Sequence, residues 1–360
     1  MISKDFFTSK KKPFVIAEIG KNFIQTEKDL DVEDYLDNAK KLVDAAKLAG
    51  ADAVKFQTHV LDDEQLKIKI KSPHFQSSDR YSWVKRNSDA TPIEFWENLN
   101  TYCKTKEIQF FSTPMSRKAA LKINHLVPFW KVGSGDIHDY LLLRALIETR
   151  KPIIISTGMV SLAELDSVVN YLKENNVEFF ILYCISKYPC PKEEFNLSTI
   201  NYFKEKYPEI VIGFSDHSIG YEASLAAVKL GAKIIEKHFT LDRKFWGSDH
   251  KVSMEPSEMK EMVELIKSED YSSIDVNDYY GNKTRELEGS NNIFRPFFEK
   301  KIVASDNLQK GVVITEDLIY TMRPSREIEG IPSNQINRVI GKITKRPINK
   351  YESITLDNIQ

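Results

Sequence analysis

Cysteine is scarce in this chain: the 360 residues include three, Cys103, Cys184 and Cys190. The odd number and the spacings match no disulfide framework, zinc motif or redox pair. We therefore expect reduced thiols, which are typical of a cytosolic protein.

Long hydrophobic runs and a surplus of one charge are also missing. Residues 1–12 have no apolar core of signal-peptide length, and no segment approaches the ~20 apolar residues of a membrane span. Lys and Arg total 51 against 52 for Asp and Glu, so the formal net charge is -1. No basic surplus exists to hold nucleic acid or an anionic membrane. The composition predicts a cytoplasmic protein without nucleic-acid or membrane partners.

Short apolar runs recur along the first two thirds of the chain. They are Phe14–Ile19, Ala53–Phe56, Ile108–Phe111, Phe129–Val132, Ile153–Ile155, Phe179–Tyr183, Ile210–Phe214 and Ile234–Ile235. Segments with helical spacing, such as Tyr35–Leu48 and Leu162–Glu174, lie between them. Strands that are apolar throughout fit a parallel sheet covered on both faces. The repeat predicts an α/β fold, a closed (β/α)8 TIM barrel; a doubly wound sheet is the alternative, but no GxGxxG turn follows the first run.

The pattern divides the chain into three parts. Residues 1–267 form the predicted barrel, and 61–91 within it are a long polar insertion, expected as a loop on the catalytic face. Residues 268–296 lack a period and predict a linker. Residues 297–360 predict a small, mostly β domain. Its expected strands are Lys301–Ala304, Val312–Ile314, Leu318–Met322, Thr344–Pro347 and Ser353–Leu356.

Two histidines follow neighbouring strands. His217 comes after Ile210–Phe214, and His238 comes after Ile234–Ile235, with a helical segment between the two runs. Because adjacent parallel strands end side by side, both imidazoles can reach one point. Two neutral imidazoles at an open site suit a catalytic divalent metal. A single histidine is more often structural, and it is the convergence that favours the metal.

Lysines and hydroxyls gather at the other strand ends, where barrel enzymes place catalysis. The residues there include Glu18, Lys55, Gln57, Thr113, Lys131, Ser134, Asp136, Ser156, Ser186, Tyr188 and Ser215. Such a ring suits an oxyanion such as phosphate, with Lys55 and Lys131 as the cations. An aldolase using either lysine as a Schiff base and a non-catalytic binding protein are the alternatives.

Several motifs together resemble the sialic acid (N-acetylneuraminate or nonulosonate) synthase family. They are IAEIG (16–20), GADAVKFQT (50–58), FFSTP (110–114), KVGSGDI (131–137), IISTGM (154–159), YCISKYPCP (183–191), IGFSDHSIG (212–220), GAKIIEKHFTLDR (231–243) and GSDHKVSMEP (247–256). The segment VASDNLQKGVVITEDLIYTMRP is similar to the antifreeze-like (SAF, β-clip) domain that follows the barrel in that family. The resemblance covers nearly the whole chain.

The resemblance implies an enzyme, a transferase, that condenses phosphoenolpyruvate with an N-acylmannosamine-type aldose, free or 6-phosphorylated, and water. The products are a sialic acid-type nonulosonate and phosphate. A related synthase acting on another sugar, of legionaminate, pseudaminate or KDN type, is the alternative. The family also implies a domain-swapped homodimer, in which Arg323 of the small domain reaches the partner's active site.

The resemblance further implies a role for each matching position. Glu18, Lys55 and Lys131 are the catalytic residues. The phosphoenolpyruvate-binding set is Lys55, Thr113, Lys131, Ser134, Ser156 and Ser186. The sugar-binding set is Gln57, Asp136, Tyr188, Ser215, Asp249 and Arg323. His217 and His238 hold the metal, Mn2+ by family likeness, with Mg2+ or Co2+ as substitutes.

Two features of the chain bear on the choice of sugar, one a departure from the family and one a resemblance to some of its branches. After EIG it has Lys21, Asn22, Phe23 and Ile24 where many members have Asn-His-x-Gly. The insertion 61–91 resembles branches that accept a 6-phosphorylated sugar. Its Arg80, Lys85 and Arg86 are therefore candidates for binding a second phosphate.

Overall fold

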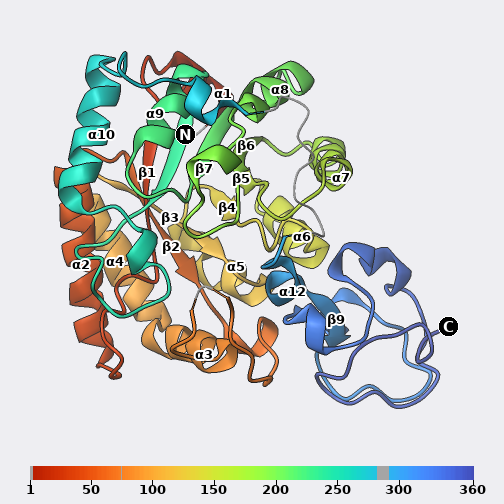
Figure 1. Ribbon diagram of the computed structural model, residues 1–360. Coiled ribbons are helices and arrows are strands. Elements are labelled where there is room, and N and C mark those ends of the chain that lie inside the picture. The colour runs from red at the N-terminus through yellow and green to blue at the C-terminus, as the bar shows by residue number, and fades with distance from the viewer. Residues whose placement is uncertain (1–2, 74, 282–291) are drawn as a thin grey trace.

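The computed structural model describes residues 3–73, 75–281 and 292–360, and its larger part is a barrel (Figure 1). Eight parallel strands close into a ring in chain order, which confirms the predicted TIM-barrel class. The strands are β1 (Phe14–Gly20), β2 (Ala53–Thr58), β3 (Gln109–Pro114), β4 (Trp130–Val132), β5 (Ile153–Ser156), β6 (Phe179–Cys184), β7 (Ile212–Asp216) and β8 (Ile234–His238). Each overlaps one of the predicted apolar runs.

Helices surround this ring (Figure 1). They are α2 (Val32–Leu48), α4 (Ile93–Thr105), α5 (Arg117–Ile123), α6 (Tyr140–Glu148), α7 (Leu162–Glu174), α8 (Ser198–Lys206), α9 (Glu222–Lys229) and α10 (Pro256–Ser268), with α1 (Lys4–Ser9) before β1. None of the described helices is long and apolar enough to cross a bilayer. The apolar runs are continuous because the strands are buried on both faces, as the wholly buried β1 and β6 show.

The strand register brings three predicted site residues together. Glu18 of β1 lies opposite Lys55 of β2 and, on its other side, opposite His238 of β8. Because β1 and β8 are the first and last strands, closure of the ring places Glu18, Lys55 and His238 side by side. Residues more than 200 positions apart in the chain thus become neighbours.

The insertion 61–91, predicted as a loop on the catalytic face, contains regular structure. It contains a short turn, η1 (Leu61–Asp63), and an eleven-residue helix, α3 (Arg80–Ala90). The Asp79 side chain accepts a hydrogen bond from the Ser82 backbone N–H at 3.0 Å and so caps this helix. Trp83 and Val84 are buried and anchor α3 to the barrel. These two apolar residues were too few to show a helical period within the polar stretch.

The small domain contains less regular strand than predicted. β9 (Lys301–Ala304) and β10 (Ile319–Met322) form a two-stranded antiparallel sheet. The expected strands at 312–314, 344–347 and 353–356 are wrong, because these segments pair through isolated bridges such as Val313 with Ile343. Turns with left-handed glycines, Gly311 (φ +86) and Gly341 (φ +81), interrupt the pairing.

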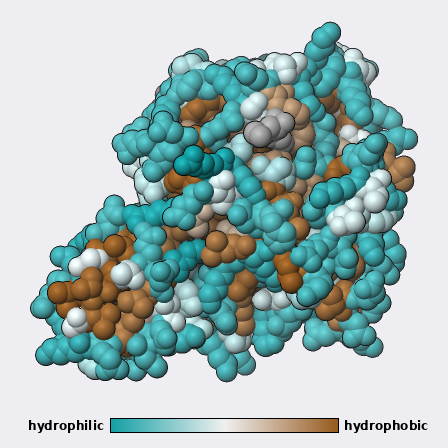
Figure 2. Space-filling view, turned by 180° about the vertical axis from the view of Figure 1, so that it is seen from behind, coloured by the Kyte–Doolittle hydropathy of each residue, from teal (hydrophilic) through white to brown (hydrophobic). Residues whose placement is uncertain are grey.

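An apolar area lies on the outside of the small domain (Figure 2). Three large apolar side chains of the small domain, Val313, Ile343 and Leu356, are 52%, 37% and 53% exposed. Exposed apolar patches on a small domain often mark an interaction surface.

Polar contacts join the small domain to the barrel beside α5 and α6. Thr321 donates a hydrogen bond to the Asp139 carboxylate at 2.8 Å, and Lys300 forms an ion pair with the same group at 2.9 Å. Leu141 of α6 packs within the apolar core of the small domain. The short helix α12 (Arg295–Phe298) immediately precedes β9 and lies against the barrel. The two parts therefore share buried contacts. Residues 282–291 of the predicted linker are outside the described residues.

Candidate active site

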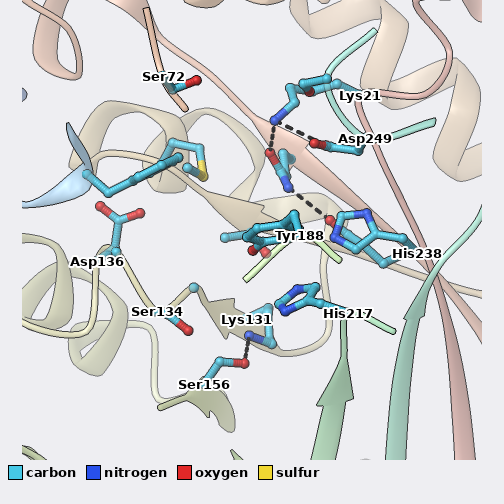
Figure 3. A pocket seen from close by; sticks show the side chains of 18 of the residues that line it. Lys21, Ser72, Lys131, Ser134, Asp136, Ser156, Tyr188, His217, His238 and Asp249 are labelled. Atoms are coloured by element: carbon cyan, nitrogen blue, oxygen red, sulfur yellow. Dashed lines mark hydrogen bonds and ion pairs between the residues drawn. The ribbon is translucent and has the colours of Figure 1, made fainter. Parts of the chain in front are cut away.

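One cavity opens at the carboxyl ends of the barrel strands (Figure 3). Most residues assigned a role from the sequence line it. These are Glu18, Lys55, Gln57, Thr113, Lys131, Ser134, Asp136, Ser156, Tyr188, Ser215, His217, His238 and Asp249. The topology explains their convergence, since parallel strands of a barrel all end on one face.

Lys131 and nearby hydroxyls form one end of the cavity. The Lys131 ammonium donates hydrogen bonds to Ser156 Oγ at 2.5 Å and to the Val132 carbonyl at 3.0 Å. Ser134 Oγ accepts a hydrogen bond from the Gly158 N–H at 2.9 Å. Burial lowers the pKa of Lys131, although Glu236 opposes this effect. A cation held among hydroxyls and a backbone N–H can receive a phosphate or carboxylate group.

Lys55 lies between two carboxylates. Its ammonium is 2.6 Å from Glu18 and 3.8 Å from Glu236, and it donates a hydrogen bond to Thr113 at 3.1 Å. Burial opposes the charge of Lys55, but the two carboxylates raise its pKa above the ordinary value. Glu236 of β8 is not among the site residues predicted from the sequence. The structure shows that it faces both cavity lysines, with Lys131 at 3.9 Å.

The two carboxylates have opposite pKa shifts. Burial raises the pKa of Glu18, and Lys55 only partly offsets this. Burial would also raise the pKa of Glu236, but Lys131 and Lys55 together hold it below the ordinary value. Divergent shifts in a pair of acids are a common basis for assigning acid and base roles. Glu236 is thus the stable anion, and Glu18 is the carboxyl group suited to carry a proton.

Lys21 extends this network towards the sugar-binding set. Its ammonium donates a hydrogen bond to Gln57 Oε1 at 2.9 Å and lies 3.4 Å from Asp249. Gln57 in turn donates to Glu18 at 3.0 Å. The sequence marked Lys21 as a departure from the family but not as a site residue, and its place in the cavity wall was missed. Neighbouring Asn22 is structural, because its buried amide donates to the Phe239 carbonyl at 2.8 Å.

The two histidines face the same part of the cavity. Their ring centroids are 5.5 Å apart, and Tyr188 packs against His217 at a centroid distance of 4.2 Å. The Ile185 carbonyl lies 2.7 Å from His217 Nδ1, which fixes the proton on that nitrogen and leaves Nε2 free to bind a metal. Burial lowers the pKa of His238 to about 3, so this ring is neutral. His238 Nδ1 is buried without a hydrogen-bond partner among the described residues.

This donor set fits a catalytic metal bound by two protein ligands. No group of three or more His, Cys, Asp or Glu side chains in the described part of the chain could hold a metal by itself. Two imidazoles leave several coordination positions for water or substrate, as catalytic sites require.

Two predicted residues do not line the cavity. Ser186 is buried with its Oγ unpartnered among the described residues, next to the Gly158 and Ser134 turn. Arg323 is fully buried behind the wall, where its guanidinium pairs with Asp136 and lies 3.5 Å from Glu64. This contact is made within one chain. The predicted exchange of small domains between subunits remains a prediction.

Of the three basic residues of α3, the structure places one in the cavity. Arg80 lines it, together with Ser72 and Ser78. Lys85 is exposed and pairs with Asp89, and Arg86, which does not line the cavity, pairs with Asp29 at 2.7 Å. The expectation that Lys85 and Arg86 face the substrate is therefore wrong. They lie on the other faces of the helix.

The residues just before the first strand of the small domain also contribute to the cavity wall. Phe298 of α12 lines the cavity, and the Asn292 amide lies 3.3 Å from the carbonyls of Gly158 and Ser186. The fold and the cavity define a barrel enzyme with a charged site at its strand ends and an appended β domain.

Comparisons with known proteins identify this class more closely. Residues 42–274 match the NeuB family model and residues 300–360 match the SAF domain, so the chain belongs to the NeuB family of sialic and nonulosonic acid synthases. It is 33% identical to human N-acetylneuraminate-9-phosphate synthase, over 91% of this chain and 88% of that protein. It is 32% identical to N,N'-diacetyllegionaminic acid synthase of Campylobacter jejuni, over 96% and 99%. Among solved structures, a spore coat polysaccharide biosynthesis protein of Bacillus subtilis is similar, with a TM-score of 0.78, 32% identity and coverage of 98% and 96%.

Proposed function

We propose that the protein condenses phosphoenolpyruvate with an N-acylmannosamine-type aldose and water to give a sialic acid-type nonulosonate and phosphate. The observation that carries the proposal is that Lys55, Lys131 and the imidazoles of His217 and His238 face one cavity. The lysines can bind a donor with two anionic groups, and a metal held by the imidazoles can bind an aldehyde acceptor. The named relatives make N-acetylneuraminate 9-phosphate and diacetyllegionaminate. A legionaminate-, pseudaminate- or KDN-type acceptor is the alternative within the same reaction class.

Phosphoenolpyruvate binds at the lysine end in this proposal. Lys131, Ser156 and Ser134 receive one anionic group, and Lys55 with Thr113 receives the other. In the reaction C3 of phosphoenolpyruvate bonds to the aldehyde carbon, and positive charge develops at C2. Water then adds at C2, and the C2–O bond to phosphate breaks. Glu236 compensates the lysines before substrate binds and helps to stabilise the developing charge at C2.

Glu18 is the residue proposed to manage protons. It lies against Lys55 and accepts a hydrogen bond from Gln57, which in turn contacts Lys21 on the sugar side. A carboxyl group with a raised pKa can take a proton from the attacking water or give one to the new alkoxide. Gln57, Tyr188, Ser215 and Asp249 are proposed to orient the sugar hydroxyls.

His217 and His238 are proposed to hold a divalent metal, Mn2+ by family likeness, with Mg2+ or Co2+ able to replace it. When bound, the metal supplies Lewis-acid polarisation of the aldehyde oxygen. The hydrogen bond of His217 to the Ile185 carbonyl orients that ring towards the cavity. Packing of Tyr188 on His217 shields the pair from water.

We further propose that the protein works as a cytoplasmic homodimer. The exposed apolar side chains Val313, Ile343 and Leu356 support a subunit contact through the small domain. Light scattering coupled to size exclusion measures the mass directly. A monomer at micromolar concentration contradicts this part of the proposal.

The reaction itself is tested by phosphate release from phosphoenolpyruvate with manganese and an acylmannosamine acceptor. Phosphoenolpyruvate carrying isotopically heavy oxygen in its C–O–P bridge adds a sharper readout. Cleavage of the C–O bond transfers the label to phosphate, whereas P–O cleavage leaves it in the sugar acid. Acceptor-independent release, or label retained in the product acid, overturns the proposal.

A further inference from the structure

Arg80 adds a buried positive charge to the cavity wall, and it comes from the helix α3 and not from a barrel strand. It is the first residue of α3, it is 7% exposed, and it lines the cavity. Its guanidinium lies over the Phe298 ring at 4.2 Å, which fixes the position of the charge without neutralising it. Burial lowers the pKa of Arg80 to about 10, and the group remains charged near neutrality.

The other cavity cations have carboxylate partners, and Arg80 has none among the described residues. Lys55 pairs with Glu18, Lys131 with Glu236 and Lys21 with Asp249. Arg80 has no ion pair within the described chain, and its Nε has no hydrogen-bond acceptor there. An uncompensated buried charge is costly, so the folded protein gains if a ligand brings the counter-ion.

Nearby acids are already engaged elsewhere. The Glu64 carboxylate is hydrogen-bonded to His59 at 2.8 Å and lies close to Arg323. The Asp136 carboxylate forms ion pairs with Arg323 and, at 2.8 Å, with Lys300. A rearrangement that gave Arg80 one of these carboxylates would leave Arg323 or Lys300 buried and unpaired. Within residues 3–73, 75–281 and 292–360, no carboxylate is thus left to pair with Arg80, and a ligand can supply the counter-ion.

The surroundings of Arg80 suit a small tetrahedral anion. Ser72 and Ser78 add hydroxyl groups to the same lining, and the aromatic rings of Phe75 and Trp83 form the wall beside them. Figure 3 shows Ser72 on the opposite side of the cavity from Lys131 and Ser156. Ser72, which shares the cavity lining with Arg80, thus lies away from the end assigned to phosphoenolpyruvate. In the same view His217 and His238 lie below Ser72 and at or above the level of Lys131.

We propose that Arg80, with Ser72 and Ser78, binds a phosphate group carried by the acceptor sugar at the end remote from its aldehyde. The inference rests on the proposed function, and it selects the 6-phosphorylated acylmannosamine over the free sugar. Arginine binds phosphate through several charge-assisted hydrogen bonds in a fixed fork. The phosphate is a recognition group and takes no part in the bond changes.

The test compares kcat/KM for N-acetylmannosamine 6-phosphate and for N-acetylmannosamine in the full-length protein with manganese. The wild type should prefer the phosphorylated sugar. Arg80→Met should lower this preference about a hundredfold, as loss of a charged hydrogen-bond pair implies. Arg80→Lys should restore part of it, and the KM for phosphoenolpyruvate should not rise. Lys85→Met, which removes an exposed cation from the same helix, is the matched control and should keep the preference.

Each outcome separates this inference from the reaction on which it rests. Equal turnover of both sugars, or a preference unchanged in Arg80→Met, overturns the phosphate subsite and leaves the synthase reaction standing. If neither sugar is consumed, the synthase proposal is wrong for these acceptors. Thermal shift then tests the subsite alone. Stabilisation by the 6-phosphate but not by the free sugar, lost in Arg80→Met, supports it, and equal shifts contradict it.

Discussion

The guanidinium of Arg323 pairs with the carboxylate of Asp136, and this buried contact connects the small domain to the cavity wall. Asp136 faces the cavity and Arg323 stands behind it. Lys300 reaches the same carboxylate at 2.8 Å. Two cations from the tail therefore hold one cavity residue in place, and they hold the pKa of Asp136 below its ordinary value although burial opposes this.

Arg323→Met tests whether this contact positions Asp136 for the sugar. The variant leaves part of a buried ion network unpaired, a change that costs about 3–5 kcal/mol of stability in comparable cases. The KM for the acceptor should rise while the KM for phosphoenolpyruvate stays near the wild-type value. Arg338→Met, at an exposed position of the same domain, is the control. Equal rises in both KM values would show a general loss of structure instead.

Removal of either cavity histidine should remove the metal. In His217→Ala or His238→Ala, manganese bound after dialysis should fall well below one per chain, and phosphate release should fall with it. His125→Ala changes an exposed histidine near α5 and should bind metal normally. Metal content is measured by plasma mass spectrometry. Full manganese occupancy in both cavity variants would refute the assignment of these ligands.

Lys131→Met should lower kcat/KM for phosphoenolpyruvate more than kcat/KM for the sugar. The ammonium is buried beside Ser156, so the variant loses a charge-assisted contact with the anionic substrate. We expect kcat/KM to fall by a factor on the order of a thousand, comparable to the loss of an electrostatic catalytic group. Steady-state kinetics with each substrate varied in turn gives the split. Lys104→Met on the exposed face of α4 serves as the control.

The Glu164–Arg295 fork should make stability depend on pH. Arg295 of α12 donates to both Glu164 oxygens, at 2.7 and 2.9 Å. Burial opposes the Glu164 charge, but these bonds and the Ser161 N–H lower the pKa of Glu164 to about 2 from 4.5. Because the folded pKa is depressed, the stabilisation is complete above pH 4.5 and is lost as the pH falls towards 2.

Glu164→Gln should therefore cost about 1–2 kcal/mol near neutral pH, allowing for solvent screening, and nothing near pH 2. Denaturant unfolding of the wild type and the variant across this range measures the difference. Glu174→Gln, at the exposed end of the same helix, should show no such trend. A constant difference between the wild type and Glu164→Gln at all pH values would rule out the linkage.

The barrel and much of the cavity follow from the sequence because both depend on local periodicity. Where an apolar run ends in Lys, Ser or His, that polar side chain is predicted to lie at the end of the strand, on the catalytic face. Glu236 carried the same signal, since it precedes His238 by two residues and a strand repeats every two residues. The sequence alone gives Glu236 no role, because an acid beside lysines can equally be a structural counter-ion.

Other residues could not be placed from local pattern. Lys21 enters the cavity because Gly20, the last residue of β1, turns the chain with a φ of +55°, and no period predicts that direction. Arg80 depends on how the insertion folds, and the cap at Asp79 appears only once the helix is known. The partner of Arg323 is 187 positions away, a distance over which the sequence of one chain contains no signal.

The segment that joins the two parts of the molecule is itself a piece of the binding site. Asn292 contacts the turns after β5 and β6, and Phe298 supports Arg80. Modular proteins exchange whole domains at such joints without damage to either half. Here a break at the joint would remove side chains that form part of the cavity wall. We therefore expect recombination between relatives to preserve this junction intact.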